Sequence, residues 1–98
     1  MPRPRTRKRI CFKPSAVFFK PRGVPLRSLQ IVRLSHEELE AMRLKNIENL
    51  SQLDCAERMH TSQSTVQRLL TSGYEKVTKA IVEGRAIEVE EKYLGLTR

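Results

Sequence analysis

A group of polar side chains at helical spacing could contact the edges of nucleic-acid bases. These residues are Gln63, Ser64, Gln67 and Arg68, with Thr65 at the margin of the group. Glutamine can form two hydrogen bonds with adenine, arginine can do so with guanine, and serine or threonine can contact a base or a phosphate. No acidic residue lies between Glu57 and Glu75, as expected of a surface that faces phosphates. We expect this group to contact DNA bases.

The residues that usually carry catalysis or bind metals are isolated in this chain. Cys11 and Cys55 form no Cys-x-x-Cys motif, and neither His36 nor His60 lies in a Cys/His cluster, so we expect free thiols and no zinc site. We find no nucleophile–base pair, paired carboxylates or glycine-rich phosphate loop. We therefore expect no catalytic residue, no metal and no cofactor, which argues against an enzyme.

Capping signals and apolar periodicity predict three helices. The first begins at Ser35, which forms a capping box with Glu38, and extends to residue 46. The second spans residues 51–59 behind a serine cap. The third spans residues 63–84 and ends at a glycine, a common helix terminator.

The second and third predicted helices have the dimensions of a helix-turn-helix, whose last helix enters the major groove of DNA. Leu53, Ala56 and Met59 are expected to form the apolar face of the second helix, with the small Ala56 at the helix crossing. Val66 and Leu69 are expected to point back from the third helix toward it. This packing leaves the polar group of the third helix exposed.

Short extended segments flank the predicted helices. Residues 30–34 and 86–90 have strand-like patterns, and their pairing would join the two ends of the helical body. We therefore expect a mainly α fold: a helix-turn-helix three-helix core with short extended segments at the N-terminal arm and C-terminal tail. The expected organisation is a basic arm (1–33), a helix-turn-helix domain (34–84) and a tail (85–98).

The charge of the chain is concentrated in the arm. The 98-residue chain has a formal net charge of +8, yet residues 1–33 hold ten basic residues and no acid, whereas residues 34–84 hold six basic and eight acidic residues. A basic arm on a near-neutral body indicates a polyanionic partner. The residues expected to contact DNA phosphates are Arg3, Arg5, Arg7, Lys8 and Arg9 in the arm and Gln52 and Ser62 at helix N-termini.

Several segments together resemble the prokaryotic "domain of unknown function 134" family, whose members are predicted to bind DNA. The resemblance covers about residues 1–90 and is carried by residues 1–5, 9–12, 19–26, 39–44 and 50–59. The helical part is also similar to the helix-turn-helix of sigma-factor region four, which implies a transcription-type role. The chain departs from the family pattern in the turn, where His60 and Thr61 replace a glycine and an aliphatic residue. The turn requires a left-handed backbone, which we therefore expect His60 to adopt with some strain.

These observations predict a sequence-specific protein that binds double-stranded DNA and regulates transcription. An RNA-binding or ribosome-associated protein, or a module that binds RNA polymerase, remain as alternatives. The chain has no apolar run of the roughly 18 residues that a membrane helix needs, so we expect no membrane partner and a cytoplasmic location. A homodimer, formed through the tail or through Val77 and Ile81, would extend the DNA site.

Overall fold

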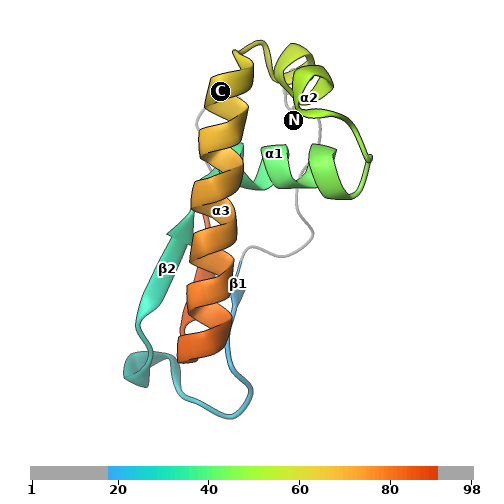
Figure 1. The fold of residues 1–98 in the computed structure, drawn as a ribbon. Helices are drawn as coiled ribbons and strands as arrows, with labels where there is room; N and C mark the ends of the chain where they lie inside the picture. Colours follow the sequence, from blue (N-terminus) through green and yellow to red (C-terminus); the bar gives the residue numbers. More distant parts are fainter. Residues whose placement is uncertain (1–17, 91–98) are drawn as a thin grey trace, which may run out of the picture.

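The computed structural model describes residues 18–90, and its fold is mainly α, as predicted (Figure 1). The helices are α1 (His36–Asn46), α2 (Gln52–Met59) and α3 (Gln63–Glu83), preceded by a short 3-10 helix, η2 (Leu26–Ser28). The strands are β1 (Phe18–Phe19), β2 (Ile31–Leu34) and β3 (Ala86–Val89). No helix within residues 18–90 has both the length and the apolar character required to cross a membrane.

The strands form one small sheet in the order β1-β3-β2. The predicted pairing of the two flanking segments is confirmed: β2 and β3 run parallel, with Val32 opposite Ile87. Phe18 and Phe19 of β1 pair antiparallel with the other edge of β3. The three helices form the crossover that joins the parallel strands. The expected boundary between residues 33 and 34 falls inside β2.

Each α-helix begins with the serine cap that the sequence predicts. The Ser35 Oγ accepts a hydrogen bond from the Glu38 backbone N at 3.0 Å, and the Ser35 N donates to the Glu38 Oε1 at 2.8 Å. Ser51 caps α2 and Ser62 caps α3, each by accepting from the backbone N three residues later at 3.1 Å. Gly84 ends α3 in the left-handed conformation. The bounds of the helices therefore follow from local bonds.

The helical core lies where α1, α2 and the first half of α3 meet. Its buried members are Ala41, Leu44, Cys55, Ala56, Val66 and Leu70. Met59 and Leu69 pack against this cluster, in agreement with the sequence prediction. The prediction for Leu53 is wrong, because its side chain is 64% exposed. The buried face of α2 is centred on Cys55, Ala56 and Met59, which leaves Leu53 more than about a quarter of a turn away.

A glycine allows α1 and α3 to cross closely. A Cβ atom built on Gly73 would lie 2.6 Å from the Met42 Sδ, well inside normal contact distance. The absence of a side chain at Gly73 therefore brings the two helices together at this level. This contact sets the distance between α3 and the rest of the body.

Candidate nucleic-acid interface

The turn between α2 and α3 is held by backbone hydrogen bonds around a left-handed residue. His60 has φ 58° and ψ 47°, so the predicted conformation is confirmed. The Thr61 N donates to the Ala56 O at 2.9 Å, and the His60 N donates to the Glu57 O at 3.2 Å. This pair of bonds is the Schellman motif. It ends α2 abruptly and redirects the chain into α3.

Buried polar contacts fix α3 against α1. The Glu38 carboxylate, whose side chain is 6% exposed, forms an ion pair with the Lys76 Nζ at 2.9 Å. The Ser72 Oγ donates to the Glu38 Oε2. We refer to Glu38, Ser72 and Lys76 as the Glu38 cluster. The sequence indicates Glu38 only as a capping residue and carries no signal for its contacts with α3.

The environment of Glu38 favours its charged form. Burial by itself raises the pKa of this carboxyl, but the hydrogen bonds from Ser72, Lys76 and the Ser35 backbone, together with the charge of Lys76, outweigh it. The pKa of Glu38 therefore lies below its usual range. At neutral pH the cluster contains a carboxylate that accepts bonds from both helices.

The structure brings the predicted base-contacting residues together on the first turns of α3. Gln63, Ser64, Gln67 and Arg68 are exposed, and Thr65 is half-buried. Residues four positions apart lie on the same side of a helix, so Gln63 aligns with Gln67 and Ser64 with Arg68. These two rows form one polar face that points away from the core residues Val66 and Leu70.

Hydrogen bonds along α3 orient part of this face. The Arg68 Nη2 donates to the Thr65 Oγ1 at 3.3 Å. The Gln67 Nε2 donates to the Thr71 Oγ1 at 3.3 Å. Both contacts involve exposed side chains and can exchange for bonds to a ligand. The guanidinium of Arg68 keeps further donors free of these contacts, since arginine carries five N–H groups.

The predicted phosphate contacts lie in different settings. The Ser62 Oγ already accepts from the Thr65 backbone N and lies 3.1 Å from the Ser64 Oγ. Gln52 is half-buried at the first position of α2. Arg3, Arg5, Arg7, Lys8 and Arg9 lie outside the described residues. At these two helix N-termini, the backbone N–H groups are therefore more available to a phosphate than the side chains of Ser62 and Gln52 are.

The described charges are distributed unevenly along α3. Its first turn carries no acidic residue, although Asp54 and Glu57 are exposed on α2. Of the described basic residues of the arm, Lys20 and Arg22 lie between β1 and η2, Arg27 lies in η2, and Arg33 is the third residue of β2. Arg33 pairs with Glu88 at 3.4 Å. In Figure 1, η2 lies at the same end of the molecule as the C-terminal end of α3. The described part of the arm therefore meets α3 toward its C-terminal end, where Phe19, Lys20 and Pro21 line a cavity with Ala80 and Ile81, away from the polar first turns.

The sequence matches a known family model over nearly its whole length. Residues 1–94 match the model described as "protein of unknown function DUF134". The chain belongs to the DUF134 family. The match therefore extends over the sequence of the arm, the three helices and the sheet.

Curated DUF134 relatives carry the name UPF0251 protein. The chain is 52% identical over 90 residues to one from Desulforudis audaxviator, covering 92% of this chain and 59% of the relative. It is 51% identical over 96 residues to one from Moorella thermoacetica, covering 98% and 64%. The chain thus spans about three-fifths of the length of these relatives. No solved structure matches this DUF134 chain.

Proposed function

We propose that this DUF134 protein binds double-stranded DNA sequence-specifically and regulates transcription. One observation carries the proposal: the first turns of α3 present Gln63, Ser64, Gln67 and Arg68 as an exposed face without carboxylates, directly after a tight turn from α2. A helix placed in this way can enter the major groove while the preceding helix crosses the backbone. The similarity of the helical part to the helix-turn-helix of sigma-factor region four supports the same role.

In the proposed complex, affinity and specificity come from different parts of the chain. Arg68 can form two hydrogen bonds with guanine, and Gln67 can pair with adenine. Backbone N–H groups at the start of α3 can donate hydrogen bonds to a phosphate, because the helix dipole is positive there. The arm arginines Arg3 and Arg5, together with their basic neighbours, add affinity that depends on salt and little on sequence.

Arg68 provides the most direct test. Fragments selected from random duplex DNA by the wild-type chain supply the cognate sequence. We expect Arg68→Ala to weaken cognate binding by about 10- to 100-fold, because a good bidentate contact is worth about 1–3 kcal/mol, and to leave random-duplex binding nearly unchanged. Arg27→Ala is the matched control, because Arg27 is also exposed but lies in η2.

Two outcomes would contradict this proposal. Equal losses of affinity for cognate and random duplexes would show that Arg68 does not contact bases. Preference for structured RNA over duplex DNA, in a competition repeated across a salt series, would favour the RNA-binding alternative.

A second candidate function, binding to RNA polymerase, is favoured by exposed apolar residues beside the helix-turn-helix. Ile47 at the end of α1 is 72% exposed, and Leu53 on α2 is 64% exposed. Apolar groups of this size at a surface are common in protein interfaces. Leu53→Glu should then abolish capture of purified polymerase while duplex binding is retained. Retained capture by Leu53→Glu would refute this candidate.

A further inference from the structure

The exposed side chains of α3 change from polar to apolar along the helix. In the first turns it carries the polar residues described above, whereas toward the C-terminal end Tyr74 is 41% exposed, Ile81 73% and Val82 76%. Tyr74 is oriented by a 2.6 Å hydrogen bond between its hydroxyl and the Asn46 Nδ2. These apolar side chains remain largely exposed to solvent and form a surface suited to another protein.

Two residues on this surface are placed symmetrically about Thr78. Tyr74 lies four positions before Thr78, and Val82 lies four positions after it, so all three share one side of α3. An antiparallel copy of the helix placed against this side would set Tyr74 against Val82 of the second copy, and the reverse. The small Thr78 at the centre allows two helix axes to approach to about 8–10 Å.

The charges flanking Thr78 allow two contacts between opposite charges of the two copies. Glu75, Lys79 and Glu83 alternate in sign at four-residue spacing. In the antiparallel arrangement Glu75 of one copy approaches Lys79 of the other, and the symmetry repeats the contact. Duplex DNA is a less suitable partner for this surface, because the carboxylates of Glu75 and Glu83 repel phosphates. Since the chain has a net charge of +8, two copies can approach most readily where their charges alternate.

We propose that this surface, centred on Thr78 and comprising Tyr74, Ile81 and Val82, pairs antiparallel with the same surface of a second copy. Such a two-fold contact is isologous, which means that both copies use the same surface and no second interface is needed to form the dimer. The proposal concerns the protein without DNA and therefore stands independently of the proposed function.

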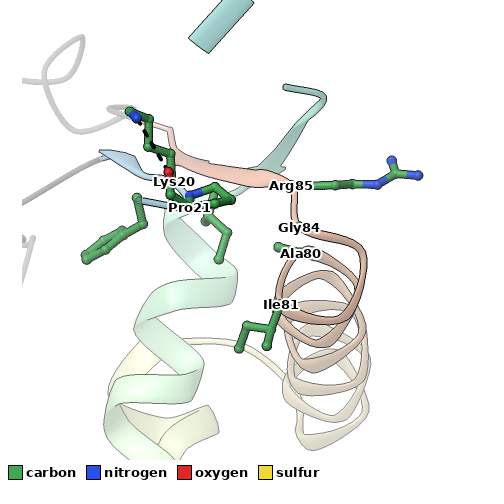
Figure 2. A pocket seen from close by; sticks show the side chains of 8 residues that line it. Lys20, Pro21, Ala80, Ile81, Gly84 and Arg85 are labelled. Atoms are coloured by element: carbon green, nitrogen blue, oxygen red, sulfur yellow. Dashed lines mark hydrogen bonds between the residues drawn. The ribbon is translucent and has the colours of Figure 1, made fainter. Parts of the chain in front are cut away.

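A cavity next to Ile81 extends the apolar surface onto the sheet. It has a volume of about 320 Å³, and Phe19, Pro21, Ile81 and Ile87 contribute apolar lining (Figure 2). In Figure 2 the Arg85 side chain extends away from the cavity, and it pairs with Glu83 at 2.7 Å. An apolar side chain of the second copy therefore fits this cavity better than a charged small molecule.

The predicted dimer is weak. The contact spans about two helical turns and the adjoining cavity, whereas a stable interface involves about 20–30 residues and roughly 800 Å² per partner. We expect a dissociation constant in the micromolar range. Sedimentation equilibrium of the full chain without DNA, up to about 100 µM and near 0.15 M salt, should show a monomer–dimer equilibrium. A wild-type chain that stays monomeric throughout this range would overturn the proposal.

Two exposed isoleucines provide a matched pair of variants. Ile81→Glu should weaken dimerisation by at least tenfold, because it places a carboxylate in the apolar contact. Ile47→Glu is the control, since Ile47 is 72% exposed and Ile81 73%, but Ile47 lies at the end of α1. Circular dichroism should show both variants folded. Equal weakening by the two, or dimerisation retained by Ile81→Glu, would overturn the proposal.

Disulfide trapping tests the predicted geometry. In a Cys11→Ser background, Thr78→Cys should form a covalent dimer rapidly under mild oxidation, because the two-fold axis passes beside this residue. Thr71→Cys should not, although Thr71 is also exposed on α3. Rapid trapping at both positions would indicate parallel helices, and trapping at neither would indicate another interface. Either result would refute the antiparallel contact.

Discussion

Replacement of Glu38 should reveal how α3 is held against α1. Glu38→Ala removes the acceptor for the Ser35 backbone N at 2.8 Å, the bond from the Ser72 Oγ and the ion pair with Lys76 at 2.9 Å. The cap is worth about 1 kcal/mol, and hydrogen bonds to a charged group about 1.5–3 kcal/mol each. The Lys76 side chain is 36% exposed. Solvent therefore weakens its ion pair with Glu38, and we assign this pair about 1.5 kcal/mol or less.

We therefore expect Glu38→Ala to lower the free energy of unfolding by about 3 kcal/mol. For a chain of this size that corresponds to a fall in Tm of about 12–24 °C. Urea denaturation followed by circular dichroism gives the first quantity, and thermal melting gives the second. Glu57→Ala, at an exposed site of α2, is the control and should change the unfolding free energy by less than about 0.5 kcal/mol.

The contribution of the Glu38 charge depends on pH. Because the pKa of folded Glu38 is depressed, its stabilising contribution is present above the unfolded pKa of about 4.3 and is lost as pH falls through the folded pKa. Glu38→Gln should thus be less stable than wild type at pH 7, and the difference should shrink below about pH 5. A difference that stays constant on acidification, or no difference at pH 7, would refute this account of the cluster.

Two further variants or measurements address the turn and the core. His60→Gly should raise the unfolding free energy by about 0.5–1 kcal/mol in urea melts, because glycine adopts φ 58° without a Cβ clash. A less stable variant would show instead that the His60 side chain stabilises the turn. Burial raises the pKa of the Cys55 thiol, so in a Cys11→Ser background a thiol reagent should label Cys55 only as fast as the chain unfolds, and faster in urea. Labelling that exceeds the unfolding rate would contradict burial of this residue.

The sequence by itself determined the local elements of this DUF134 protein. Ser35, Ser51 and Ser62 mark the helix starts, and Gly84 marks the end of α3, because each acts through hydrogen bonds or backbone conformation within a few residues. The left-handed turn at His60 was also predictable, because a short connection between two packed helices requires it. The polar face that begins at Gln63 follows from helical periodicity alone.

Only the tertiary structure decided how these elements are arranged. The sequence predicted that residues 30–34 and 86–90 pair, but the parallel direction emerges from the three-helix crossover between them. Lys76 reaches Glu38 from 38 positions away, and the exposure of Leu53 depends on which face of a short helix meets its neighbours. Local bonds are encoded by nearby residues, whereas packing depends on the shapes and distances of elements that meet only in the folded chain.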